Sequence, residues 1–108
     1  MLYMKHKTLI QIEKRIEKIK QELLRTGQMR PGSLTCQYRN PKEKTGPFYQ
    51  LSYTHKMRSR TEYVRPEYVE QLRKQIDEYK RFKELVEEWI DLGIQHSKMQ
   101  IDRAKKDK

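Results

Sequence analysis

Few residues of this chain combine a reactive side chain with the spacing that a catalytic or metal site requires. The single cysteine, Cys36, and the three histidines, His6, His55 and His96, are scattered and lack the short spacings of zinc ligands. No histidine belongs to a recognisable motif with a serine or cysteine nucleophile, and most acidic residues lie among basic ones in helical stretches. The sequence therefore predicts no catalytic residue, no metal site and no cofactor.

The basic residues of positions 28–65 suit the binding of a polyanion. This stretch carries eight lysines and arginines against two acidic residues, a net charge of +6 out of the chain's +10. Such side chains neutralise phosphates, and two-stranded ribbons can present them to nucleic-acid grooves. The predicted nucleic-acid-binding residues are Arg30, Arg39, Lys42, Lys44, Lys56, Arg58, Arg60 and Arg65. The alternative is that these charges only keep a sheet edge soluble.

Three tyrosines of the same stretch, Tyr49, Tyr53 and Tyr63, are further candidates for contacts with nucleic acid. If they faced solvent, their rings could stack on unpaired bases. We favour the other interpretation, in which the rings pack on the helices and the hydroxyls lie at the rim of the core.

Length and composition set limits on the class of protein. The chain has 108 residues, of which 34% are apolar and 37% charged, so we expect one domain with a modest core. A single cysteine excludes an intramolecular disulfide and indicates a reducing compartment. The sequence contains neither a signal-peptide pattern nor an apolar run near the roughly 20 residues of a membrane span. We therefore predict a soluble, cytoplasmic protein that does not contact membranes.

A helix is predicted within residues 1–27, beginning near Thr8. Thr8 and Gln11 have the spacing of a capping box, in which each side chain bonds the other residue's backbone amide. An apolar seam typical of a coiled coil follows, made of Leu9, Ile12, Ile16, Ile19 and Leu23. We expect Thr26 and Gly27 to end the helix, with Gly27 in the left-handed conformation.

The basic stretch 28–65 is predicted to form three strands. A turn at Pro31 and Gly32 precedes a short strand whose apolar residues alternate from Leu34 to Tyr38. A polar loop is expected from Asn40 to Gly46, because Pro41 interrupts regular structure. The other two strands, Phe48–His55 and Arg58–Val64, are rich in aromatic and β-branched residues.

These last two strands are expected to pair as an antiparallel hairpin around Lys56 and Met57. A two-residue loop would place Tyr53 opposite Arg60, Leu51 opposite Glu62 and Tyr49 opposite Val64, all on one face. The other face would carry only polar side chains in its central part: Gln50, Ser52, Thr54, Ser59 and Thr61. A loop one residue longer or shorter would exchange the faces.

A second helix is predicted from Pro66 to about Lys105, followed by a short basic tail at 106–108. It would be about twice as long as the first helix, so part of its apolar stripe is expected to extend beyond that partner. Exposed apolar stripes of this kind usually mark interfaces, most often between two copies of a chain. The predicted interface residues are Leu85, Trp89, Ile90, Ile94 and Ile101, together with Leu92.

Several blocks, in order along the chain, resemble one family. They are RPGSLT (30–35), QYR (37–39), GPFYQLSY (46–53), TEYV (61–64) and YKRFKELVEEWIDL (79–92). The family consists of small uncharacterised prokaryotic proteins with a domain of unknown function, often encoded near transposases and other mobile elements. Many members carry a zinc-knuckle-like cysteine cluster before the Gly-Pro-aromatic block, but the matching loop, 40–45, has no cysteine. The resemblance therefore implies no zinc site here.

Together, the patterns predict an α+β fold: a helix, a three-stranded antiparallel β unit, and a long second helix packed antiparallel on the first. The hairpin also resembles, at the level of fold only, the three-stranded arm-binding sheets of some phage integrases. The favoured function is a non-enzymatic accessory protein that binds DNA or RNA, associated with mobile elements through the resemblance. The alternative is a structural subunit that dimerises or docks on a larger protein through the second helix, with no nucleic-acid role. A small enzyme ranks third.

Overall fold

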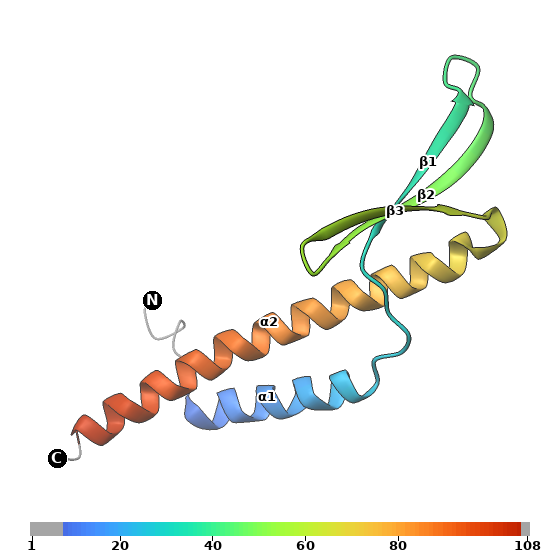
Figure 1. The fold of residues 1–108 in the computed structure, drawn as a ribbon. Coiled ribbons are helices and arrows are strands. Elements are labelled where there is room, and N and C mark those ends of the chain that lie inside the picture. The colour runs from blue at the N-terminus through green and yellow to red at the C-terminus, as the bar shows by residue number, and fades with distance from the viewer. Residues whose placement is uncertain (1–7, 107–108) are drawn as a thin grey trace. The chain divides into compact units, whose positions relative to one another are not determined.

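A computed structural model describes residues 8–106 of the chain. Its elements follow the order α1 (Leu9–Leu24), β1 (Ser33–Asn40), β2 (Thr45–His55), β3 (Arg58–Val64), the 3-10 turn η2 (Pro66–Tyr68) and α2 (Val69–Lys106) (Figure 1). They form two compact units, one from residues up to 26 and from 82 onward, the other from residues 27–81. Because α2 passes through both, each unit packs on a different part of that helix. The predicted α+β architecture is confirmed.

Helix α1 begins as the sequence predicts. The Thr8 hydroxyl accepts a hydrogen bond from the Gln11 amide at 3.1 Å, and the Gln11 side chain accepts one from the Thr8 amide at 3.0 Å. This reciprocal pair satisfies two amides that have no partner inside the helix. The capping box therefore fixes where the chain turns into α1.

The helical unit packs α1 antiparallel on the second part of α2. Ile12 and Ile19 of α1 are fully buried (0% exposed), and they meet Leu85 and Leu92 of α2. One contact shows that the two helices run in opposite directions: the carboxylate of Glu13, at the start of α1, lies 2.8 Å from the His96 imidazole near the end of α2. The predicted a/d seam of α1 is thus the face that α2 covers.

The prediction that the second part of α2 extends beyond α1 is wrong. We expected the second part of the helix to extend beyond α1, but this is the part on which α1 packs. Leu85 is only 7% exposed, and Trp89 packs against the same cluster with the Lys20 ammonium 5.5 Å from its ring centroid. Leu85 and Leu92 are therefore buried core residues of the helical unit, and Trp89 is half-buried against them, so none of the three belongs to an open stripe.

The segment between α1 and the sheet also differs from expectation. Helix α1 ends at Leu24 with Arg25 at its C-cap, and Gly27 is not in the left-handed region. Instead, the Gly27 amide donates a 2.7 Å hydrogen bond to the Glu78 carboxylate on the first part of α2. Pro31 and Gly32 are not in a turn, and Gly32 has φ of 144°. The segment is thus fixed by long-range contacts that local patterns do not encode.

The sheet has the order β1–β2–β3 with antiparallel pairing throughout. The predicted β2–β3 register is confirmed, since Tyr53 pairs with Arg60, Leu51 with Glu62, and Tyr49 with Val64. Strand β2 starts three residues earlier than predicted, and the expected loop 40–46 shrinks to a turn at 41–44. The extra residues continue the β1–β2 ladder to the pair Asn40 and Thr45.

The core of the sheet unit lies between one sheet face and the first part of α2. Leu51 and Val64 of the sheet and Val69 and Ile76 of α2 are buried together. Tyr49, Tyr53, Leu34 and Leu72 pack around this cluster. The sequence predicts the second helix from Pro66, but α2 begins at Val69 and Pro66 instead opens η2, where its missing amide proton costs nothing.

Candidate nucleic-acid interface

Three predicted binding residues, Lys56, Arg58 and Arg60, gather at the end of the β2–β3 hairpin. All three are exposed. Arg58 and Arg60 alternate with Ser59, so they share one sheet face, and Lys56 is in the two-residue turn. We call these residues the β2–β3 cluster.

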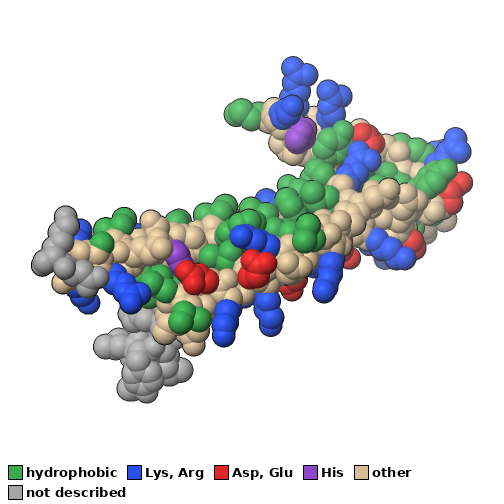
Figure 2. All heavy atoms as spheres, turned by 90° about the horizontal axis from the view of Figure 1, so that it is seen from below, with side chains coloured by type: hydrophobic (Ala, Val, Ile, Leu, Met, Phe, Trp, Pro, Cys, Tyr) green, Lys and Arg blue, Asp and Glu red, His purple; other side chains and the backbone are tan. Residues whose placement is uncertain are grey.

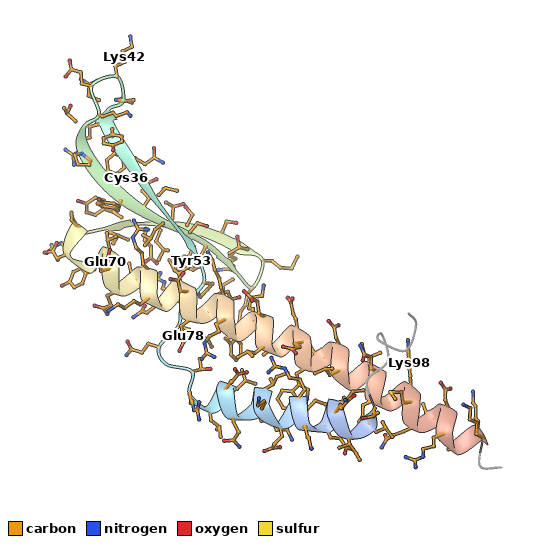
Figure 3. All side chains as sticks on the ribbon, turned by 180° about the vertical axis from the view of Figure 1, so that it is seen from behind. Cys36, Lys42, Tyr53, Glu70, Glu78 and Lys98 are labelled. Carbon is orange, nitrogen blue, oxygen red and sulfur yellow. The ribbon has the colours of Figure 1, made fainter. Side chains whose placement is uncertain are left out.

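Three others, Arg39, Lys42 and Lys44, gather at the opposite end of β2, around the β1–β2 turn. They are also exposed, and Figure 3 shows Lys42 at the end of this hairpin. We call them the β1–β2 cluster. Strand β2 has 11 residues, so at about 3.3 Å per residue the two clusters are up to about 33 Å apart.

Arg30, in contrast, is bound within the sheet unit. Its Nη2 donates a 2.7 Å hydrogen bond to Glu62, and its guanidinium lies 5.0 Å from the centroid of the Tyr53 ring. The Tyr53 hydroxyl donates to the other Glu62 oxygen at 2.9 Å. These hydrogen bonds, that from Arg30 above all, lower the pKa of Glu62. Arg30 therefore acts as a brace for the β unit, and its side chain is less exposed than those of the two clusters.

The eighth predicted residue, Arg65, joins neither cluster. It is exposed at the N-cap of η2, directly after the end of β3. On the face that Figure 2 shows, lysine and arginine side chains stand at several separate places. The eight predicted residues thus divide into two clusters of three, one exposed arginine and one internal brace.

The sheet face away from the core is lined with hydroxyls. Ser52 and Thr61 lie 3.2 Å apart and Thr54 and Ser59 2.8 Å apart, each pair bonded across β2 and β3. Tyr63 is exposed on the same face. Tyr49 and Tyr53 pack on the core, as favoured from the sequence, so Tyr63 is the one of these three tyrosines whose ring is exposed to solvent.

The described residues bring together no set of side chains that could hold a metal ion. Within residues 8–106, no group of three His, Cys, Asp or Glu side chains is close enough to hold a metal ion, while His6 lies outside the described residues. Cys36 is exposed, and hydrogen bonding to its thiol raises the pKa of Tyr38 two residues along β1. We assign no reaction to this pair.

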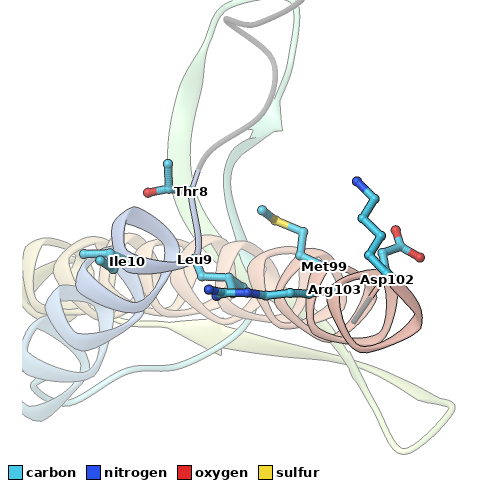
Figure 4. A pocket seen from close by; sticks show the side chains of 7 residues that line it. Thr8, Leu9, Ile10, Met99, Asp102 and Arg103 are labelled. Carbon is cyan, nitrogen blue, oxygen red and sulfur yellow. The ribbon is translucent and has the colours of Figure 1, made fainter. Parts of the chain in front are cut away.

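A groove of about 490 Å³ lies in the helical unit, between the start of α1 and the end of α2 (Figure 4). Leu9, Ile10 and Met99 make its lining largely apolar, and Asp102 and Arg103 are among its charged lining residues. These lining residues include no nucleophile paired with a base, so we assign no chemistry to the groove either.

The predicted interface residues of α2 separate onto two faces. Ile90, Ile94 and Ile101 are 56%, 50% and 53% exposed. At about 100° per residue, they lie roughly opposite Leu92, which faces α1. An apolar stripe therefore remains open on α2, but it is narrower than predicted and excludes Leu85 and Trp89.

The sequence patterns do not single out two residues of the sheet unit, Glu78 and Met57. Glu78 binds the Arg81 guanidinium and the Gly27 amide, and these contacts lower its pKa. Met57, in the turn beside the β2–β3 cluster, is 97% exposed. The one feature of the sequence that points to Met57 is a methionine at a turn position that Gly or Asn normally occupies.

Comparison with known proteins identifies a family for the chain. A family model described as Domain of unknown function (DUF6788) matches residues 9–74, which is more than half of the chain. No match was found among curated proteins or among solved structures. In the described part of the chain, no helix has the length and apolar character needed to cross a membrane.

Proposed function

The chain belongs to the DUF6788 family, whose description assigns no activity, and we propose from its exposed charges that it is a non-enzymatic nucleic-acid-binding protein. Its β unit would contact phosphates through the β1–β2 and β2–β3 clusters. We extend the proposal to an accessory role for mobile elements, on the family resemblance noted from the sequence.

The observation that carries the proposal is the charge left exposed on the β unit. Of the two acidic residues between positions 28 and 65, Glu62 is neutralised by Arg30. Glu43 is then the other acidic residue of this stretch, beside seven exposed cations: the six of the two clusters and Arg65. Phosphate neutralisation by such residues supplies most non-specific affinity for nucleic acid. The exposed hydroxyls and Tyr63 add groups that can donate to phosphates or stack on bases.

The test is a fluorescence-anisotropy titration with labelled duplexes of several unrelated sequences. Arg58→Ala with Arg60→Ala removes two cations from the hairpin, so it should weaken binding to every duplex and flatten the salt dependence by about two units. Lys105→Ala with Lys106→Ala removes the same charge from exposed positions of the last turn of α2 and serves as the control. Equal binding by the hairpin variant and the parent at matched salt would exclude the hairpin as the site.

A second candidate function is self-association through α2. It is favoured by the stripe of Ile90, Ile94 and Ile101 on the α2 face opposite α1. Two copies could cover these side chains in an isologous interface, the commonest arrangement in oligomers. The two functions are compatible, since the stripe belongs to the helical unit and the basic clusters to the sheet unit.

A further inference from the structure

The most exposed large apolar side chain recorded in the described residues is Met57, at the end of the β2–β3 hairpin. It is 97% exposed, so it contributes almost nothing to the core. Lys56 and Arg58 flank it in sequence, and Arg60 lies on the same hairpin. An apolar tip surrounded by cations is an unusual use of a turn, where a small polar residue would serve folding better.

The backbone conformation at this tip is one that other residue types adopt more easily than lysine and methionine. Lys56 has φ of 52° and Met57 has φ of 65°, and the pair His55 and Arg58 closes the loop. Two left-handed residues in a two-residue loop define a type I′ turn, which strongly prefers Asn-Gly. Lysine and methionine are disfavoured there because their Cβ atoms crowd the backbone. Strain of this kind often marks a functional position.

The hairpin below the tip is braced. The pairs Thr54 with Ser59 and Ser52 with Thr61 bond across its outer face, directly beneath the turn. On the other face, Tyr53 bonds Glu62, which also binds Arg30. A braced strand pair can hold an apolar side chain at a fixed position beyond its last hydrogen bonds.

We propose that Met57 is a wedge that inserts between base pairs of duplex DNA from the minor groove, while Lys56 and Arg58 contact the phosphates on either side. Proteins that insert methionine or other apolar residues in this way unstack one base step and bend the duplex. This inference rests on the proposed function and specifies its ligand and its mode of binding. The outcome for the DNA is a kink at the bound site.

Other partners fit this tip less well. A single side chain buries too little apolar area to hold a protein partner or a membrane by itself. Double-stranded RNA has a wide, shallow minor groove that would not enclose a hairpin tip. Duplex DNA has a narrower minor groove and base steps that open at modest cost.

The test measures bending separately from binding. A duplex with donor and acceptor dyes at its two ends reports bending as a rise in energy transfer, and the anisotropy of one dye reports binding. The parent should bind and raise the transfer. Met57→Gly should bind with a salt dependence within about one unit of the parent's but lose most of the rise.

Two further variants guard against trivial explanations. Glycine accepts the left-handed backbone at position 57, so Met57→Gly should not unfold the hairpin. Met57→Leu keeps an apolar wedge and should keep most of the bend, and Met29→Ser removes another exposed methionine of the sheet unit and should change nothing. Binding without bending, or undiminished bending by Met57→Gly, would overturn the wedge alone. Absence of binding by the parent would overturn the proposed function with it.

Discussion

Replacing Gly32 with alanine tests the account of how the β unit is held. Gly32 has φ of 144°, a conformation open almost only to glycine. A Cβ built there would lie 2.6 Å from Leu51 Cδ1 and 3.1 Å from the Ser52 carbonyl oxygen. Leu51 is fully buried and cannot turn aside freely, and the Ser52 oxygen belongs to the β2 backbone. The substitution therefore meets both backbone strain and a packed neighbour.

The expected cost follows from these two effects. Backbone strain of this kind costs about 1–3 kcal/mol, and overpacking of a full core costs about 1–3 kcal/mol. We expect Gly32→Ala to lower the free energy of unfolding by about 3 kcal/mol, a large share of the roughly 5–15 kcal/mol of an ordinary domain. In the same unit, Gly27→Ala is the matched control, because its Cβ would meet Glu78 Oε2 at an ordinary 3.6 Å and its φ is not left-handed.

The assay is chemical denaturation followed by far-UV circular dichroism, with fluorescence of the single tryptophan, Trp89, reporting on the helical unit. Gly32→Ala should lower the denaturation midpoint of the circular dichroism signal clearly. Gly27→Ala should leave it unchanged or raise it slightly, because alanine restricts the unfolded chain. Equal midpoints for the two variants would refute the packing that we describe around Gly32.

Three further predictions concern charge, assembly and metal. The pKa of Glu62 is lowered from its usual 4.5, so the stability that its ion pair contributes is present above that pH and is lost as the pH falls through the lowered value. Thermal melts should therefore show a smaller acid-induced loss of stability in Glu62→Gln than in the parent, and identical profiles would contradict the role of the Arg30 brace. If the stripe on α2 joins two copies, light scattering should give a dimer mass at tens of micromolar, and Ile90→Glu should shift it toward monomer because it places a charge in the interface; a monomeric parent would remove the idea. The thermal midpoint should not change in excess chelator, and a fall of several degrees would reveal a metal site built from residues such as Cys36 and His55.

Local patterns predicted the elements well because their causes are local. The capping box at Thr8, the seam of α1 and the Pro66 start of η2 each depend on residues within a few positions of one another. The β2–β3 register followed from a two-residue loop, because the period of a strand then assigns every residue to a face.

The sequence does not indicate which part of α2 packs on α1 and which part packs on the sheet. Val69, Leu72 and Ile76 form an apolar stripe on the first part of α2, and Leu85, Trp89 and Leu92 form one on the second part. Periodicity alone does not say which stripe meets α1 and which meets the sheet, so the predicted overhang falls on the wrong part of α2. The contact of Gly27 with Glu78 likewise joins positions 51 apart and leaves no local signal.

The same limit applies to the candidate site. Counting charges placed eight basic residues in one stretch, but the pairing of β1, β2 and β3 sends three to each end of β2. Arg30 differs from the other seven because it contacts Glu62 and Tyr53, which lie beside it only in the folded sheet. The exposure of the Met57 side chain and the left-handed backbone of its turn are properties of the folded hairpin that the sequence does not specify.

The most direct test of nucleic-acid binding is the affinity of the parent chain for a duplex across a series of salt concentrations. Each phosphate that a lysine or arginine neutralises contributes about −0.9 to the slope of log K against log salt concentration for B-DNA. Contact through one cluster of three cations therefore predicts a slope near −3, and contact through both predicts about −5. A saturable interaction with a slope in this range would support the account, and no binding at low salt, or a slope near zero, would contradict it.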